Sequence, residues 1–173
     1  MTVRVREARV GDRGAIEAVT LAAYQEYAPQ MPQHWELYRQ NIVGTLAKIE
    51  PEHQLVAEQA GRIVGAVLLY PAGTSLTSPR GETITLALPE VRLLAVSPEG
   101  RGRGVGEALM RECLRLAQES GAPGITLHTT EMMQAAMRLY ERMGFVRVPE
   151  LDLRPLPGVV AKGYRLLFAP AAP

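Results

Sequence analysis

The feature that most restricts the fold is an apolar run that leads directly into a cluster of glycines. Leu93–Val96 has no polar side chain, which is typical of a strand buried on both faces. Four glycines follow within the seven residues from Gly100 to Gly106. Helical spacing of apolar side chains begins at Val105. The sequence therefore predicts a strand, a glycine-rich turn and a helix in direct succession.

A turn of this composition suits an anion. Glycines keep side chains away, so that backbone N–H groups can converge, and the start of the helix adds unpaired N–H groups and a positive dipole end. Arg101 and Arg103 add positive charge. A Walker loop is excluded, because Val105–Gly106 stands where Lys-Ser/Thr is required, and no G-x-G-x-x-G fingerprint is present. The turn predicts a pyrophosphate site, with an ordinary tight strand–helix connection as the alternative.

Strand and helix patterns alternate along the chain. A hairpin is expected at Ala60–Gly61 and an exposed loop over Pro149–Val160. Strands are predicted at Val3–Ala8, Gln54–Gln59, Arg62–Tyr70, Glu90–Val96, Gly124–Thr129, Phe145–Val148 and Ala161–Phe168, with a further short one at Thr83–Leu86. Helices are predicted at Asp12–Tyr27, with Asp12 as N-cap, and at Trp35–Ile49, Gly104–Glu119 and Met132–Met143. This order indicates an α/β fold with a mixed sheet and helices on both faces.

Length and charge limit the class of protein. The 173 residues fit one domain, and a net charge of +1 gives no overall field toward nucleic acid or an anionic membrane. The single Cys113 excludes an intrachain disulfide. We expect a cytoplasmic protein, because no signal-peptide pattern or membrane-length apolar run occurs. The scattered histidines match no metal-ligand spacing, so no metal is expected.

Two blocks together resemble the GNAT superfamily of N-acetyltransferases, which bind acetyl-CoA. Arg101–Gly106 (RGRGVG) resembles the family motif Arg/Gln-x-x-Gly-x-Gly/Ala, and Leu93–Pro98 resembles the end of the strand that precedes it. Ala136–Phe145 (AMRLYERMGF) resembles the family segment A-x-x-x-Y-x-x-x-G-F. The resemblance is specific over Glu90–Phe145 and covers most of the chain in architecture.

The resemblance implies a GNAT-like fold, with a central mixed, mostly antiparallel sheet of about six or seven strands. It implies one acyltransferase domain over residues 1–173. Within it, residues 1–89 would shape the acceptor site, 90–145 would form the acetyl-CoA-binding core and 146–173 would supply the C-terminal strands. Members often dimerise, which makes a homodimer a candidate assembly.

The resemblance also implies how acetyl-CoA is held. Its pantetheine arm would pair with the main chain of Leu94, Ala95 and Val96, beside a bulge that opens a slot in the sheet. Thr129 and Thr130 lie at a strand end where relatives carry polar residues near the cofactor. The pyrophosphate would lie on the backbone of Arg101, Gly102, Arg103, Gly104, Val105 and Gly106.

Two proton-transfer groups are candidates for catalysis. Tyr140 stands where the family's general acid stands and could protonate the leaving thiolate, although its ring could instead simply pack against the sheet. Glu90 occupies the place of a base glutamate that acts through water in some relatives, and an exposed strand-end carboxylate is the alternative. Glu131 and His128 are rivals for the base, and many relatives use only ordered water.

The expected function is transfer of the acetyl group of acetyl-CoA to a primary amine of a small molecule or peptide, by direct attack in a ternary complex. Two alternatives remain: a non-catalytic acyl-CoA-binding or regulatory domain, and a generic anion site in a binding module. Four aromatic residues could line an acceptor pocket or belong to the core of two helices: Tyr24, Tyr27, Trp35 and Tyr38.

Overall fold

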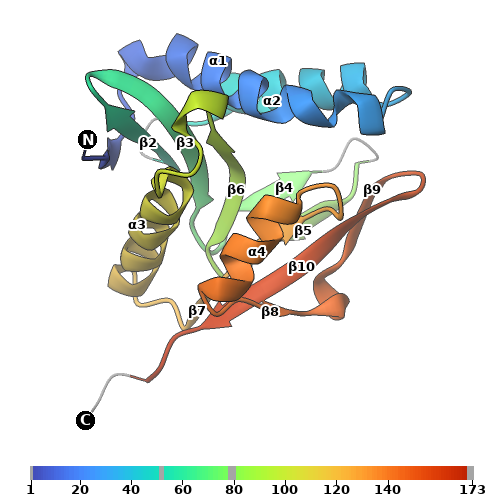
Figure 1. Ribbon diagram of the computed structural model, residues 1–173. Helices are drawn as coiled ribbons and strands as arrows, with labels where there is room; N and C mark the ends of the chain where they lie inside the picture. The colour runs from blue at the N-terminus through green and yellow to red at the C-terminus, as the bar shows by residue number, and fades with distance from the viewer. Residues whose placement is uncertain (1, 51–52, 78–80, 171–173) are drawn as a thin grey trace. The chain divides into compact units, whose positions relative to one another are not determined.

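The computed structural model describes residues 2–50, 53–77 and 81–170 (Figure 1). The chain divides into two compact units, one of Met1–Leu69 with Leu93–Glu112 and the other of Tyr70–Arg92 with Cys113–Pro173. Three elements contribute residues to both: β3 (Arg62–Tyr70) through its last residue, β6 (Glu90–Val96) and α3 (Val105–Glu119). The expected single domain with three segments stays a prediction.

The strands of the first unit form an antiparallel run. β1 (Arg4–Glu7) pairs with β2 (Gln54–Gln59), which pairs in turn with β3 (Arg62–Tyr70). The hairpin predicted at Ala60–Gly61 is confirmed: both residues have positive φ, 50° and 73°. This left-handed pair matches the two-residue turn that follows the twist of the flanking strands. Consecutive β3 residues are buried, so both faces of the strand are covered.

Gly65 explains how one of those faces is covered. A Cβ atom at this glycine would lie 2.8 Å from Cγ1 of Val105 and 3.1 Å from Cδ1 of Leu109, both at the start of α3. The absence of a side chain therefore lets α3 pack directly on β3. Ser97 then donates its backbone N–H to Val64 O at 2.9 Å. These contacts fix the glycine-rich turn between the end of β6 and the start of α3.

The N-terminal helices of the first unit differ from the prediction at one end. α1 (Arg13–Tyr24) lies beside α2 (Trp35–Lys48) (Figure 1). The first helix was expected to reach Tyr27, but the α-helical backbone stops at Tyr24 and continues as a tighter 3₁₀ helix, η2 (Gln25–Gln30). Pro29 within η2 lacks an N–H and opposes a continued α-helix.

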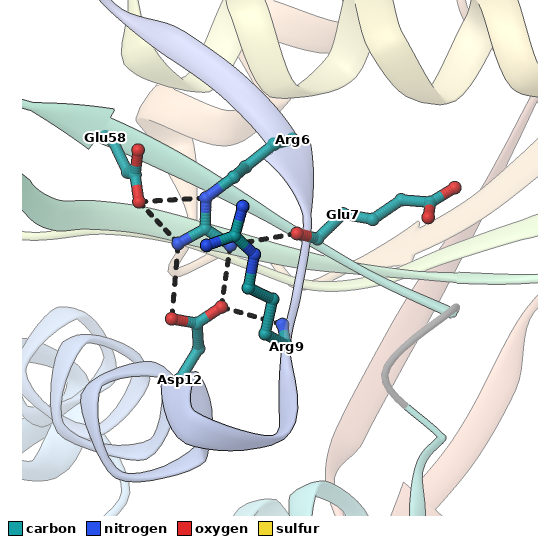
Figure 2. Close-up of polar contacts among 5 residues, drawn as sticks. All are labelled: Arg6, Glu7, Arg9, Asp12 and Glu58. Atoms are coloured by element: carbon teal, nitrogen blue, oxygen red, sulfur yellow. Dashed lines mark hydrogen bonds and ion pairs between the residues drawn. The ribbon is translucent and has the colours of Figure 1, made fainter.

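Arg6 links three segments of the first unit (Figure 2). Its Nε donates to Glu58 Oε1 at 2.8 Å, its Nη2 also contacts that oxygen, and its Nη1 donates to Asp12 Oδ2 at 2.7 Å. Asp12 has the predicted N-cap position of α1, but its side chain makes no cap bond there. Instead it accepts the backbone N–H of Arg9 at 2.7 Å. The arginine thus holds β1, β2 and the start of α1 together.

The strands of the second unit contain the parallel pair that the alternation predicted. Glu90 and Val91 of β6 pair in parallel with β7 (Gly124–Thr129), and β7 pairs antiparallel with β10 (Val159–Leu167). β10 also pairs antiparallel with β8 (Val146–Arg147) and β9 (Leu153–Leu156). The mixed, mostly antiparallel sheet is confirmed, and within the described residues its eight strands include β9.

Two segments hold more structure than the sequence predicted. The expected loop at Pro149–Val160 contains the 3₁₀ turn η5 (Pro149–Leu151) and strand β9. β9 pairs with β10 alone among the described strands, and such an edge strand tolerates Pro155, whose missing N–H can face away from its neighbour. Ahead of the short predicted strand, now β5 (Thr83–Thr85), lies β4 (Ser75–Thr77), with which it forms a separate two-stranded ribbon.

Candidate functional site

The glycine-rich turn has the backbone that its composition predicts. After the 3₁₀ turn η4 (Pro98–Gly100), Gly102 and Gly104 adopt φ of 70° and 76°, and α3 begins at the next residue, Val105. Left-handed backbone at two alternate positions turns the chain and can bring its backbone N–H groups together beside the N-terminus of the helix. The first turn of a helix has N–H groups without intrahelical acceptors. The turn can therefore hold an anion through its backbone.

The two arginines of the turn are held by neighbours in the first unit. Arg101 Nη1 lies 2.5 Å from Glu26 Oε2, and its Nη2 lies 3.4 Å from Ala23 O at the end of α1. Arg103 Nη1 donates to Gln59 Oε1 at 3.3 Å. Contacts between partly exposed side chains are weak, so a bound phosphate could replace the present partners of either guanidinium.

A pocket of about 260 Å³ lies beside the turn in the same unit. Glu99 and Arg103 of the turn face it, and the β2–β3 hairpin supplies the rest of its lining, Gln59, Ala60, Arg62 and Val64. Two guanidinium groups against one carboxylate give the pocket a positive balance. It can accept an anionic group next to the backbone site.

The C-terminal half of β6 is less covered than predicted. Leu93–Val96 was expected to be buried on both faces, yet Leu93, Leu94 and Val96 are only half-buried, while Ala95 is buried. Leu93 also has φ of 50°, a left-handed conformation that interrupts the extended backbone within the strand. This irregularity stands where the resemblance implied a bulge. Half-exposed apolar residues next to it can receive an extended chain such as pantetheine.

Four buried polar atoms lack a hydrogen-bond partner among the described residues. They are Oγ of Ser97 at the end of β6, Oγ1 of Thr129 and Thr130 at the end of β7, and Nδ1 of His128. Buried polar groups are nearly always satisfied, so these atoms can accept a hydrogen bond from, or donate one to, a bound molecule or water. Amides of an acetyl-CoA molecule could satisfy the hydroxyls of Thr129 and Thr130. The residues present thus fit the cofactor that the resemblance implies.

Glu90 lies at the centre of a buried polar cluster in the second unit. Its carboxylate is 3% exposed and accepts Arg92 Nε at 2.7 Å and Thr126 Oγ1 at 3.3 Å. Nδ1 of His128 lies 3.4 Å from Glu90 Oε1. Burial raises the pKa of Glu90, but His128 and Arg92 outweigh it, so the pKa lies below its usual value. Glu90 is therefore ionised at neutral pH, and the exposed-carboxylate alternative is excluded.

The rival base Glu131 is placed differently. Its side chain is 76% exposed and its Oε1 lies 2.6 Å from Lys162 Nζ. This ion pair lowers the pKa of Glu131. An exposed carboxylate already paired with a lysine is a weak candidate for proton transfer, and the structure gives it no link to the Glu90 cluster.

Tyr140 lies on α4 (Gln134–Arg142), the helix predicted at Met132–Met143. Its ring is 5% exposed and packs against Phe145, with ring centroids 6.0 Å apart. Its carbonyl accepts the backbone N–H of Phe145 at 3.0 Å. The two aromatic residues of the second sequence block therefore form one packed unit. This position is compatible with either role expected for Tyr140.

The aromatic residues of the first unit form one cluster. Tyr24 lies 6.0 Å from both Tyr27 and Tyr38, and Trp35 lies 6.3 Å from Tyr38, measured between ring centroids. Tyr24 is buried, whereas the other three are half-buried. Burial followed by the neighbouring Glu26 raises the pKa of Tyr27 to about 12, and burial raises that of Tyr38 to about 12. Both phenols stay neutral at physiological pH.

Sequence reasoning missed Arg92, Thr126 and Ser97 as members of the site. Arg92 was detectable, because residues two apart on a strand share a face, which places it beside Glu90. Thr126 was not, because its approach to Glu90 depends on the register of β6 against β7. Nothing in the sequence distinguishes Ser97 from an ordinary turn residue.

Two further properties concern the described part of the chain as a whole. Over residues 2–50, 53–77 and 81–170, no group of three or more His, Cys, Asp or Glu side chains could hold a metal ion. Over the same ranges, every helix is too short or too polar to cross a bilayer.

Comparison with known proteins places the two motifs in one family. The family model for acetyltransferases (GNAT) matches residues 20–145. An uncharacterised N-acetyltransferase of Bacillus subtilis, YhfO, is 28% identical over 151 residues, which are 83% of this chain and 89% of that protein. A mycothiol acetyltransferase of Acidimicrobium ferrooxidans is 34% identical over 105 residues, 61% of this chain. The chain spans 31% to 39% of the length of that relative and two others.

Solved structures agree on the fold. A GNAT family acetyltransferase of Brucella melitensis, solved in complex with acetyl-CoA, has a TM-score of 0.60 at 23% identity, covering 99% of this chain and 92% of that one. A GNAT family acetyltransferase of Staphylococcus aureus has a TM-score of 0.67 at 16% identity, covering 95% and 98%. With the match of the family model over most of the chain, these findings confirm the resemblance: the chain belongs to the acetyltransferase (GNAT) family.

Proposed function

We propose that the protein is an acetyl-CoA-dependent N-acetyltransferase that acts on a primary amine of a small molecule or peptide. The observation that carries the proposal is the turn at residues 101–106, with two left-handed glycines before the helix N-terminus. Family membership and the buried unpartnered hydroxyls at the ends of β6 and β7 support it. Acetyl-CoA supplies an acetyl thioester, an activated group open to attack by an amine.

The binding roles follow from chemistry and position. The backbone of Arg101–Gly106 holds the pyrophosphate, and the guanidinium groups of Arg101 and Arg103 turn toward it. The main chain of Leu94–Val96 pairs with the pantetheine amides. Thr129 and Thr130 donate their hydroxyls to the same arm, which satisfies two atoms that otherwise have no partner among the described residues.

The chemical roles concern two protons. The amine attacks the thioester carbonyl directly in a ternary complex, and its excess proton passes through water to the Glu90 carboxylate, which is too buried for direct contact. Tyr140 donates its phenolic proton to the departing sulfur. A non-catalytic acyl-CoA-binding domain would share the turn and lack both proton transfers, so activity distinguishes the two functions.

The first experiment is thermal unfolding with and without acetyl-CoA, with ATP and NADH as controls. At 100 times the dissociation constant, a ligand stabilises by about 2.7 kcal/mol. For a chain of this length the midpoint should therefore rise by roughly 5–10 °C with acetyl-CoA alone. The absence of any rise at saturating acetyl-CoA would contradict the proposal, and a rise with ATP or NADH would favour a generic nucleotide site.

Gly104→Ala and Gly158→Ala form a matched pair for the turn. Both glycines have φ of 76° and no atom within 4 Å of an added Cβ, so the intrinsic backbone penalty is the same. Only Gly104 belongs to the turn. We expect Gly104→Ala to weaken the affinity for acetyl-CoA at least about tenfold, seen as a smaller rise in the unfolding midpoint. Gly158→Ala should leave that rise unchanged. Equal effects would place the site elsewhere.

Tyr140→Phe tests the acid. Release of free CoA thiol is followed with a panel of primary amines and short peptides as acceptors. Loss of a general acid should lower kcat by about 10²–10⁴-fold, while the thermal shift with acetyl-CoA stays intact. An unchanged kcat would leave Tyr140 as a packing residue only.

A further inference from the structure

The Glu90 cluster contains a histidine whose two ring nitrogens have different surroundings. Nε2 of His128 lies 2.7 Å from the carbonyl oxygen of Leu151 in η5. A carbonyl oxygen can only accept, so Nε2 carries a hydrogen. In the neutral ring, Nδ1 must then carry a lone pair. The contact with Leu151 thus settles the tautomer of His128.

That tautomer creates a conflict at the other nitrogen. Nδ1 lies 3.4 Å from Oε1 of Glu90, is buried, and has no hydrogen-bond partner among the described residues. With neutral His128, a nitrogen lone pair faces a carboxylate in a buried site, where repulsion is poorly screened. One proton placed on Nδ1 turns this repulsion into a charge-assisted hydrogen bond.

We propose that Glu90 and His128 share one proton and accept it as a pair, with His128 as the positioning residue that receives it at Nδ1. The role of the pair in catalysis rests on the proposed function. The sharing of the proton does not, because the Glu90 carboxylate, the His128 ring and the Leu151 carbonyl are in contact without any substrate.

The proton balance is simple. The N–H bond that holds the excess proton of the attacking amine breaks, its electron pair stays on the amine, and the proton passes through water to form an O–H bond at Glu90 Oε1. That bond then breaks as Nδ1–H forms on His128. The pair changes from carboxylate and neutral imidazole to carboxylate and imidazolium, a gain of one positive charge. Glu90 alone would be a weak base, because the ion pair with Arg92 stabilises its charge.

The charged groups around His128 determine how strongly it binds this proton. From β6, Glu90 favours the imidazolium and Arg92, bound to Glu90, opposes it. Asp152, which follows η5, interacts electrostatically with His128 and favours the charged ring. The β10 residue opposite His128 is Gly163, which contributes no charge. Arg147, whose Nη2 lies 2.6 Å from Asp152 Oδ2, opposes the charged ring, so two carboxylates face two guanidinium groups. The direct contact of Nδ1 with Glu90 Oε1 distinguishes Glu90 among these groups.

The direct test is ¹⁵N NMR of the histidine rings in the complete chain without acetyl-CoA. The three histidines are assigned with single variants. Nε2 of His128 should carry a hydrogen in both the neutral and the charged ring, and Nδ1 should be the nitrogen that gains and loses a proton. In Glu90→Gln the midpoint pH at which Nδ1 gains its proton should fall by about one unit or more, because the negative charge of the Glu90 carboxylate is gone. In Arg92→Met it should rise.

Opposite shifts in the two variants separate proton sharing from a packing role, which would move neither. Glu131→Gln is the matched control, because that exposed carboxylate pairs with Lys162 and should leave His128 unaffected. The proposal is overturned if Nε2 is the nitrogen that titrates, or if Glu90→Gln produces no shift at Nδ1.

The catalytic consequence is tested separately with His128→Gln. The amide of glutamine can still donate to the Leu151 carbonyl, so folding should be preserved, but it cannot take up a proton. With an amine of the panel that is acetylated, we expect kcat at pH 7 to fall by about 10²-fold or more, with KM for acetyl-CoA unchanged. If no amine is acetylated, the proposed function fails while the NMR result still decides whether the proton is shared. An unaltered pH profile in His128→Gln would remove His128 from the reaction.

Discussion

At the scale of single residues, the glycines show how differently one residue type can be used. Gly163 lies against η5, where an added Cβ would be 3.0 Å from the carbonyl carbon of Leu151 and 3.1 Å from Val148 O. Gly44 lies within α2 with no atom in 4 Å of an added Cβ. The first position has no room for a side chain, whereas the second has only the conformational disadvantage of glycine in a helix.

Substitution by alanine should therefore act in opposite directions at these two positions. We expect Gly163→Ala to lower the free energy of unfolding by about 1–3 kcal/mol, because backbone atoms cannot move away easily. Gly44→Ala should raise it by about 0.5–1 kcal/mol. Urea unfolding measures both. A neutral Gly163→Ala would mean that η5 shifts freely, which would also weaken the contact between Leu151 and His128.

At the scale of secondary-structure elements, the Arg6 cluster connects segments that local preferences would not bring together. The Arg6 side chain is 15% exposed and lies between Asp12, at 16%, and Glu58, at 25%. The hydrogen bonds that Arg6 donates to Asp12 and Glu58 raise the pKa of Arg6 and lower the pKa of each carboxyl. The cluster therefore stabilises β1, β2 and the start of α1 only while both carboxylates are ionised.

The pH dependence of stability follows from these directions. Carboxyls with lowered pKa values bind protons more weakly in the folded state than in the unfolded one, so their contribution is present above the unfolded values near pH 4 and is lost as pH falls through the folded values. The free energy of unfolding should fall progressively below about pH 5. Arg6→Met should increase the unfolding equilibrium constant about tenfold at pH 7.

That difference between Arg6→Met and the parent should shrink toward pH 3, where protonated carboxyls no longer need the guanidinium. Arg39→Met is the matched control, because Arg39 pairs with Glu36 on an exposed helix face and should change stability little. Urea titrations at the two pH values measure both variants. Equal losses in the two variants at pH 7 would show that the cluster adds nothing beyond a surface pair.

At the scale of the whole molecule, three elements contribute residues to both compact units. β6 and α3 are each divided within their length, and β3 adds its last residue, Tyr70, to the second unit. Unfolding of one unit would therefore disrupt a strand and a helix that also belong to the other unit. We therefore expect a single cooperative unfolding transition.

Two probes can verify that expectation. Trp35 is the only tryptophan of the chain and belongs to the first unit, so its fluorescence reports that unit, whereas far-UV circular dichroism reports both. Their midpoints in urea should coincide. Two separated midpoints would indicate units that unfold independently.

The sequence predicted regular elements and backbone motifs better than it predicted side-chain partners. β2, β3, β6 and β7 have the predicted ends, because turn residues and apolar periodicity mark them locally. The end of α1, strand β9 and the ribbon strand β4 were missed, since each depends on pairing or on tight backbone geometry. At the site, the resemblance named Glu90 as a candidate base, which stays a prediction, while its contacts with Thr126 and His128 depend on register across strands distant in the sequence.

The left-handed backbone at Leu93 has a consequence for which amino acids can replace it. In an ordinary strand, isoleucine or valine would be the natural exchange for leucine. At φ of 50° their branched Cβ collides with the backbone, so these two should be the worst apolar replacements. Asparagine and glycine, poor residues elsewhere in a sheet, should be tolerated there. Natural variants of this chain are thus expected to keep a side chain that is not branched at Cβ at residue 93, whatever the acceptor they have come to use.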